Sequence, residues 1–242
     1  PQNNGIGAAR NRIVDEAKGR YLYFLDADDT IEPNTIELLF NAASGHRAQF
    51  VYGSYKCIEQ FEGESPQMTD FHYPDKVFTT NDDFAAYAYH DYAAIQAPVW
   101  NIMLETNMLR QHVRFPEVNY WEDFAVTTDF PVIADNAVML STITYNYYCR
   151  NNSLSNFQSR NHIDKMEIVH TIDAMKTAKN NSRSIMHKTY FPQRMLKVMK
   201  THYFICQSIL RNDAVISPAF TKREIRDIMR SPLTFGETLK LK

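Results

Sequence analysis

Three aspartates stand together after an apolar segment near the start of the chain. The segment is Tyr21–Leu25, and Asp26, Asp28 and Asp29 follow it with Ala27 between the first two. If the extended backbone continues, Asp26 and Asp28 point their side chains the same way. Two carboxylates held together repel each other unless a cation lies between them. Hard divalent ions with oxygen ligands, Mg²⁺ or Mn²⁺, are the natural partner, so the pattern predicts a metal site at Asp26 and Asp28.

By itself this acidic cluster fits more than one chemistry. A turn in which an aspartate only caps the backbone would contain the same residues. Leu25–Thr30 also resembles the first motif of haloacid-dehalogenase-like phosphatases, a hydrophobic strand followed by D-x-D-x-(T/V), with Asp26 as nucleophile and Asp28 as acid/base. Family 2 GT-A glycosyltransferases end a strand with a similar D-A-D-D motif, which holds a metal and the sugar nucleotide.

The flanking sequence favours the glycosyltransferase resemblance. Residues 3–12 read N-N-G-I-G-A-A-R-N-R, and Ala17–Gly19 precede the acidic strand. Together with residues 21–29 they resemble the family 2 signature N-x-G-x-x-x-A-R-N…A-x-G-x-Y-(apolar)-D-x-D-D. The phosphatases normally open their domain with the acidic strand, without such a helix before it. The resemblance implies an inverting, metal-dependent glycosyltransferase in which Arg10 and Asn11 serve the nucleotide site.

A second pair of acids lies further along the chain. Tyr120–Phe124 resembles the family motif (G/Y)-x-E-D-x-x-(apolar), which implies that Asp123 is the catalytic base and that Glu122 orients the acceptor or supports the loop. A positioned carboxylate can take the proton of an attacking hydroxyl. The helix dipole alone also favours acids in a first helical turn, so this pair points to catalysis only together with the rest of the pattern.

The segment Tyr147–Ser155 resembles the part that ends the core of family 2 enzymes. In such enzymes this loop closes over the diphosphate or the acceptor. The resemblance implies that Arg150 and Ser153 bind there, and a guanidinium fork suits phosphate oxygens. The alternative is an arginine in a solvated loop.

The helices and strands that must position these side chains alternate along the predicted chain. An uninterrupted apolar strand indicates a position covered on both faces, as in a largely parallel sheet, and the order of elements predicts an α/β fold. We expect a GT-A domain over residues 1–157, Rossmann-like, with a mostly parallel central sheet that lacks its first strands, and a helical C-terminal appendage over 158–242. The pattern predicts helices at 8–18, 35–43, 81–89, 101–111, 121–134, 162–179, 191–210 and 221–230, and strands at 21–25, 50–55 and 138–148.

Composition excludes several other classes of protein. The net charge of -2 gives no broad electrostatic attraction for nucleic acid. The three cysteines, Cys57, Cys149 and Cys206, form no C-x-x-C pair and are typical of reduced cytosolic thiols. No apolar run approaches the roughly 18 residues of a membrane span. We therefore expect a cytoplasmic protein, and peripheral association with the inner membrane stays open.

These observations lead to one hypothesis and two alternatives. The hypothesis is transfer of a sugar from a nucleoside diphosphate sugar to a hydroxyl of a glycan or lipid-linked acceptor, in bacterial surface polysaccharide or glycoconjugate synthesis. The alternatives are a phosphatase that uses Asp26, and a non-catalytic nucleotide-sugar-binding fragment, because the strands that bind the nucleobase in the family precede the matched region. A homodimer is left open.

Overall fold

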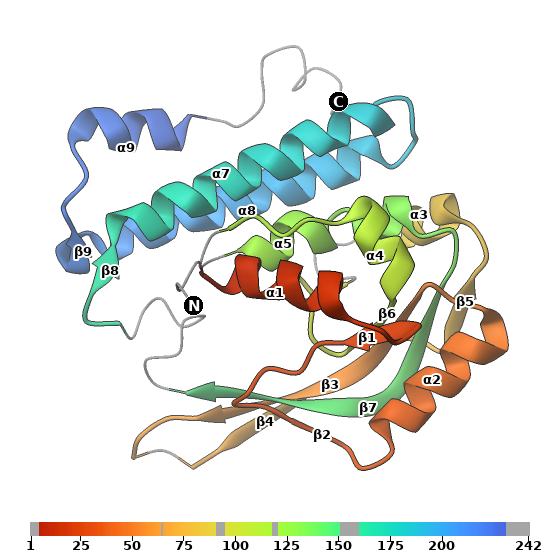
Figure 1. Cartoon of the computed structure of the whole chain (residues 1–242). Coiled ribbons are helices and arrows are strands. Elements are labelled where there is room, and N and C mark those ends of the chain that lie inside the picture. The colour runs from red at the N-terminus through yellow and green to blue at the C-terminus, as the bar shows by residue number, and fades with distance from the viewer. Residues whose placement is uncertain (1–4, 64, 91–94, 118–120, 151–159, 231–242) are drawn as a thin grey trace.

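A twisted, mixed sheet forms the centre of the chain, and helices cover both of its faces (Figure 1). The computed structural model describes residues 5–63, 65–90, 95–117, 121–150 and 160–230. Within that part the sheet has seven strands in the order β1-β6-β3-β7-β2, with β4 paired to β3 and β5 paired to β7. The strands are β1 Tyr21–Tyr23, β2 Thr30–Ile31, β3 Phe50–Gln60, β4 Gln67–Phe71, β5 Lys76–Phe78, β6 Ile102–Glu105 and β7 Ala137–Arg150.

The two faces of the sheet carry different helices. Phe50 and Tyr52 of β3 face a core built with α1, α3 and α4, whereas Val51 between them packs with Leu39 of α2 on the other face. This alternation is the period of two that an extended strand imposes. The helices of this part are α1 Gly5–Glu16, α2 Thr35–His46, α3 Asn81–His90, α4 Thr106–His112, α5 Glu122–Thr127 and α6 Phe130–Ile133.

The predicted α/β class is confirmed, but the sheet is mixed rather than mostly parallel. In the described sheet β3 and β7 pair in parallel, while β6 lies antiparallel between β1 and β3. The strands β1, β3 and β7 therefore run in one direction, and the others run against them. The sequence pattern predicted one helix over 101–111 and missed β6, because the short apolar run Ile102–Leu104 leads directly into α4.

Two other predicted elements differ from the structure: one strand is shorter than expected, and one helix is divided in two. The strand predicted at 21–25 stops at Tyr23, and Leu25 is exposed. The single helix predicted at 121–134 is divided into α5 and α6. Pro131 explains the division, since it lacks the N–H that would bond to the carbonyl of Thr127 in a continuous helix.

Two long helices, α7 Lys165–Asn181 and α8 Phe191–Arg211, lie across α5 and α3, and α9 Lys222–Met229 follows them (Figure 1). These three helices confirm the predicted helical C-terminal region. The predicted boundary at residues 157 and 158 lies outside the described residues, and α5 shares one apolar cluster with α7 and α8. None of the described helices is long and apolar enough to cross a membrane. The remaining elements are β8 Ile163–Asp164, β9 Ile216–Ser217 and the 3₁₀ turns Ser182–Ile185 and Asp213–Val215.

A fully buried arginine joins these helices to the rest of the chain. Arg194 of α8 donates to Ser182 Oγ at 2.6 Å and to Tyr89 Oη at 2.8 Å. It also forms an ion pair with Asp129 and a hydrogen bond to the carbonyl of Thr128, in the connection between α5 and α6. A buried guanidinium needs this full set of acceptors. The side chain thus fixes α8 against the segment that follows the acids of α5.

Candidate active site

The acidic turn, Asp26–Asp29, connects β1 to β2 and is held by its own backbone and by β7. The amide of Asp29 donates to the carbonyl of Asp26 at 3.1 Å, which closes the turn. The buried carboxylate of Asp29 accepts hydrogen bonds from Tyr145 Oη at 2.6 Å and from the amide of Tyr148 at 2.9 Å. Asp29 is therefore the residue that attaches the turn to β7, which leaves Asp26 and Asp28 for other partners.

Asp26 and Asp28 have different surroundings. The carboxylate of Asp26 lies 3.7 Å from the guanidinium of Arg10, and its side chain is 37% exposed. Burial raises the pKa of Asp26, while the positive charge of Arg10 opposes that rise. Asp28 is exposed, and its carboxylate makes no hydrogen bond or ion pair with any residue in the described part of the chain. Both carboxylates can thus be reached by a ligand.

The end of β7 also reaches this turn. Arg150 donates from Nη2 to the carbonyl of Asp28 at 3.0 Å, and its guanidinium lies 5.4 Å from the centre of the Tyr148 ring. The structure therefore brings the predicted arginine to the predicted acids. Ser153, the other residue predicted from this segment, lies outside the described residues.

Arg10 connects the acidic turn to α5. Its side chain is only 7% exposed, and it forms an ion pair with the equally buried Glu122 while lying 3.7 Å from Asp26. The rings of Phe24 and Phe115 lie 6.0 Å and 5.7 Å from the guanidinium carbon. The arrangement excludes a solvent-facing arginine and places Arg10 between the two groups of acids.

Asn11, the neighbour of Arg10, forms two hydrogen bonds with the backbone of a single residue, Phe115. Its Nδ2 donates to the carbonyl of Phe115 at 2.8 Å, and its Oδ1 accepts from the amide of Phe115 at 2.8 Å. Helix α1 and residues 113–117 are in close contact here, since a Cβ on Gly7 would lie 1.9 Å from the carbonyl oxygen of Pro116. Asn11 therefore holds Phe115 against Arg10, and its predicted contact with the nucleotide stays a prediction.

Asp123 sits in the first turn of α5, directly after Glu122. The amide of Phe124 donates to its Oδ1 at 2.7 Å. Burial, helped by the negative charge of Glu122, raises the pKa of Asp123 to about 7, against the opposing charge of Arg10. Burial also raises the pKa of Glu122, and Arg10 is the main group that counteracts it. Asp123 is thus a carboxyl group that changes its protonation near neutral pH.

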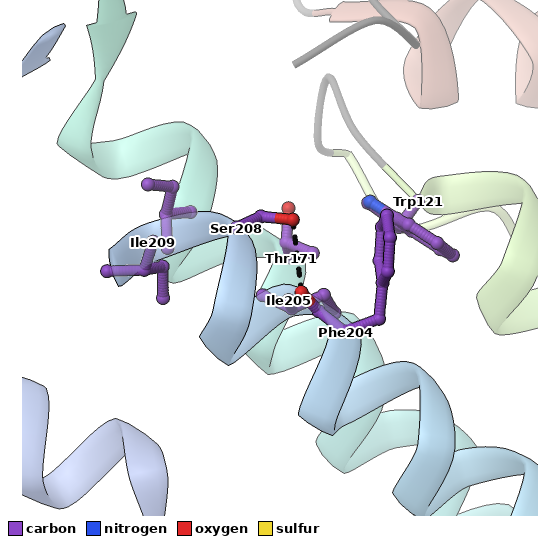
Figure 2. A pocket seen from close by; sticks show the side chains of 7 residues that line it. Trp121, Thr171, Phe204, Ile205, Ser208 and Ile209 are labelled. Carbon is purple, nitrogen blue, oxygen red and sulfur yellow. Dashed lines mark hydrogen bonds between the residues drawn. The ribbon is translucent and has the colours of Figure 1, made fainter. Parts of the chain in front are cut away.

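Trp121 precedes these acids in a left-handed conformation, with φ 58°. Figure 2 shows its indole facing Phe204 of α8, and the ring centres are 6.2 Å apart. Phe124 meets the indole edge-on at 5.7 Å. The slot beside the indole has a cavity volume of about 20 Å³, which is room for about one water molecule. The slot is lined by Trp121, Ile168, Thr171, Phe204, Ile205, Ser208 and Ile209.

The sequence pattern missed three of these positions. Trp121, Tyr145 and Phe115 carry no chemistry that a motif would select, yet they hold the residues that do. The predicted acids and Arg10, by contrast, meet at one place. The arrangement can bind a cation at exposed carboxylates and can accept a proton at Asp123.

Comparison with known proteins decides the family. The family model described as Glycosyl transferase family 2 matches residues 1–104, which contain Arg10 and the acidic turn. The N-terminal part of the chain, residues 1–104, belongs to glycosyltransferase family 2. The predicted family, its GT-A fold class and its enzyme class are thereby confirmed.

Curated relatives carry the same family name. The chain is 27% identical over 163 residues to "Glycosyltransferase GlyA" of Streptococcus pneumoniae, a match that covers 64% of this chain and 22% of GlyA. It is 26% identical to "Glycosyltransferase GlyG" of the same organism, over 62% of this chain and 50% of GlyG. "Succinoglycan biosynthesis protein ExoO" of Rhizobium meliloti is 24% identical, over 68% and 48%. The chain thus spans half or less of the length of these relatives.

A solved structure is also similar to this chain. The crystal structure of residues 1–349 of TarS from S. aureus in complex with UDP matches it with a TM-score of 0.48 and 16% identity. The match covers 97% of this chain and 57% of the TarS chain.

The acidic turn of this family 2 domain offers a small set of oxygen ligands. In the described part of the chain, no three side chains of His, Cys, Asp or Glu gather in a way that could hold a metal ion. Mg²⁺ is usually bound by one or two carboxylates together with waters and substrate phosphates. The exposed Asp28 and the partly exposed Asp26 fit such a site.

Proposed function

We propose that this family 2 domain moves a sugar from a nucleoside diphosphate sugar to an acceptor hydroxyl with inversion at the anomeric carbon. The observation that supports the proposal most directly is the position of Arg10 between Asp26 and Glu122. It places the acidic turn, which suits a diphosphate and its metal, beside the carboxyl group that suits an acceptor proton. A single displacement needs both groups at one reacting carbon.

The acidic turn takes the donor side. Asp26 and Asp28 would hold Mg²⁺ or Mn²⁺, which when bound neutralises negative charge on the leaving diphosphate. Arg150 already donates to the carbonyl of Asp28, and its other N–H groups can bind a diphosphate oxygen. Binding of the donor by Ser153 stays a prediction. Arg10 and Asn11 serve the donor site by fixing Asp26 and the Phe115 backbone.

Asp123 takes the acceptor side. A general base works best when its pKa lies near the working pH, and the pKa of Asp123 is raised to about 7. The acceptor oxygen attacks the anomeric carbon, its proton moves to Asp123, and the bond to the diphosphate oxygen breaks. Glu122 orients this region through its ion pair with Arg10, and its negative charge helps to raise the pKa of Asp123.

The name of one relative supports a proposal for the biological setting. That relative is named for succinoglycan biosynthesis, and we propose a glycan or lipid-linked acceptor in surface polysaccharide synthesis. Peripheral membrane association and a homodimer stay predictions. The match to family 2 supports glycosyl transfer over the phosphatase alternative, and a non-catalytic nucleotide-sugar-binding fragment remains the competing proposal.

Calorimetry with UDP and Mn²⁺ tests the donor side. We expect the folded chain to bind UDP more tightly with Mn²⁺ than with EDTA, and Asp28→Asn to abolish the difference. Glu37 of α2 is an exposed acid that lies outside the acidic turn, so Glu37→Gln is a matched control that should bind as the wild type does. A folded sample that gives no heat with UDP and Mn²⁺ would overturn the proposal.

Hydrolysis of the donor tests catalysis without a known acceptor, because water can replace the acceptor hydroxyl. With UDP-α-glucose or UDP-α-N-acetylglucosamine as probe, an inverting enzyme releases the β-anomer first, which NMR detects before mutarotation. Asp123→Asn should lose this release and keep UDP binding. Metal-dependent UDP binding without release of sugar from either donor or to added glycans would favour the non-catalytic fragment.

A further inference from the structure

A single buried tyrosine lies under the acidic turn. The side chain of Tyr145 in β7 is fully buried, and its ring stacks on Trp100 with 4.5 Å between centres and 7° between planes. This packing fixes the direction in which the hydroxyl points, because a stacked, enclosed ring has little freedom to rotate. The hydroxyl is directed at the acidic turn, where two hydrogen bonds meet it.

These two hydrogen bonds reach both ends of the turn. Tyr145 Oη accepts from the amide of Asp26 at 3.3 Å and donates to Oδ2 of Asp29 at 2.6 Å. The amide of Asp29 in turn donates to the carbonyl of Asp26 at 3.1 Å. Tyr145, Asp26 and Asp29 therefore form a closed ring of hydrogen bonds. Ala27 and Asp28 lie between its two ends, and both are exposed.

We propose that Tyr145 is a positioning residue that holds the acidic turn in the shape that receives a divalent cation and the donor diphosphate. The inference rests on the proposed function. Tyr145 touches neither ligand in this assignment; it acts through Asp26 and through the backbone that carries Asp28. Residues behind the direct ligands commonly set the ligand geometry in this way.

The hydroxyl must stay protonated to donate to Asp29. Burial, together with the hydrogen bond to Asp29 and its charge, raises the pKa of Tyr145 well above its ordinary value. Burial also raises the pKa of Asp29, while the bonds from Tyr145 and Tyr148 oppose that rise. Across the neutral range the Tyr145 hydroxyl therefore keeps its proton and can donate to Asp29.

Tyr73 supplies a matched control in the same core. Its side chain is buried, and its hydroxyl also accepts from one amide and donates to one side-chain oxygen. Both partners belong to Gln96, at 3.0 Å and 3.3 Å, so the acidic turn is not involved. Tyr73→Phe and Tyr145→Phe thus remove the same number of hydrogen bonds from two buried phenols.

Amide hydrogen exchange is the first readout, because it needs no ligand. We expect the Asp26 amide to exchange faster in Tyr145→Phe, since its acceptor is gone, and to keep wild-type protection in Tyr73→Phe. The second readout is the Mn²⁺ concentration that half-saturates UDP binding. Tyr145→Phe should raise it roughly 10- to 100-fold, the usual cost of losing a partner behind a metal ligand, while UDP affinity in EDTA stays unchanged.

Wild-type protection of Asp26 and wild-type Mn²⁺ affinity in Tyr145→Phe would overturn the inference. If Tyr145→Phe does not fold, Asp29→Ala tests the same ring of hydrogen bonds, since it removes the oxygen that accepts from the Tyr145 hydroxyl; unchanged protection and Mn²⁺ affinity there would overturn the inference equally. If the wild type shows no metal-dependent UDP binding, the proposed function fails, and the exchange comparison still decides whether Tyr145 holds the turn.

Discussion

Arg10 and Glu122 form a buried ion pair although they lie 112 positions apart in the sequence. Arg10 belongs to α1, and Glu122 is the first residue of α5. Both charges have lost most of their hydration, so each depends on the other. Since the guanidinium also lies 3.7 Å from Asp26, the pair links the fold of the chain to the assembly of its candidate site.

Arg10→Met should destabilise the chain, because it leaves the buried carboxylate of Glu122 without a partner. Breaking one side of a buried ion pair costs about 3–5 kcal/mol, measured as the free energy of unfolding in urea. Arg12→Met is the matched control, since Arg12 lies on the same helix and pairs with Glu16 while its side chain is 71% exposed. That variant should unfold at nearly the wild-type urea concentration, since an exposed ion pair contributes little to stability. Equal losses in the two variants would contradict this account of Arg10.

The rate of transfer should rise with pH through about 7, because Asp123 must be deprotonated to act as the base and its pKa is raised to about 7. Glu122→Gln should move the rise to lower pH, since it removes a negative charge that raises this pKa. The measurement is kcat/KM against pH in both proteins. A profile that Glu122→Gln leaves in place would show that another group controls the rate.

The raised pKa of Asp123 also affects stability, and here the effect of pH is reversed: stability falls as the pH rises, whereas the rate increases. A carboxyl group whose pKa is raised from 3.8 to about 7 on folding binds its proton more tightly in the folded chain. Its contribution to stability is therefore complete below the unfolded pKa and is lost as the pH rises towards 7. Asp123→Asn should unfold with a shallower dependence on pH between about 4 and 7, followed as urea midpoints. An identical dependence in the wild type and the variant would contradict the raised pKa.

Arg194→Met should weaken the attachment of α7 and α8 to the rest of the chain. It should therefore lower the free energy of unfolding more than the substitution of an exposed arginine does. It leaves Asp129 without its buried partner, and the expected loss is again about 3–5 kcal/mol. Arg223→Met is the control, because Arg223 is 88% exposed and pairs weakly with Asp227. Urea unfolding followed by tryptophan fluorescence reports the change, since Trp121 contacts α8. A loss no larger than that of Arg223→Met would refute the anchoring role.

The sequence predicts the acids better than it predicts what holds them. Asp26, Asp28 and Asp123 belong to short patterns with a fixed spacing, so local sequence is enough to select them. The partners that place them come from distant segments: Tyr145 lies 116 positions from Asp29. No spacing rule connects such residues, because their contact depends on the order of strands in the sheet.

The strand β6 shows that the fold, too, depends on contacts between distant segments that local sequence does not reveal. Its first three residues, Ile102–Leu104, are a short apolar run, and the strand leads into α4 without a break. A short apolar run does not distinguish a strand from a buried helical turn. Its pairing with β1 and β3 decides its conformation, and a single sequence does not contain that information. The helices of the C-terminal region have longer periodic patterns and were predicted closely.

Phe204→Ala should slow transfer although Phe204 lies on α8, outside both groups of acids. Its ring faces the indole of Trp121 (Figure 2), and Trp121 directly precedes Glu122 and Asp123 in a left-handed conformation. Removing the ring frees the indole on one side, so the first turn of α5 loses part of its support. A misplacement of about 1 Å can lower the rate by about 100-fold, so we expect the smaller displacement in this variant to lower kcat by roughly tenfold.

Tyr203→Ala is the control for this change, because Tyr203 is the neighbouring aromatic residue of α8 and is 64% exposed. It should keep the wild-type kcat, and both variants should keep the wild-type affinity for UDP with Mn²⁺, since the acidic turn is untouched. The comparison is made by steady-state kinetics together with calorimetry. If Phe204→Ala and Tyr203→Ala have the same kcat, α8 does not position the base, and the left-handed turn at Trp121 is held by Phe124 within α5.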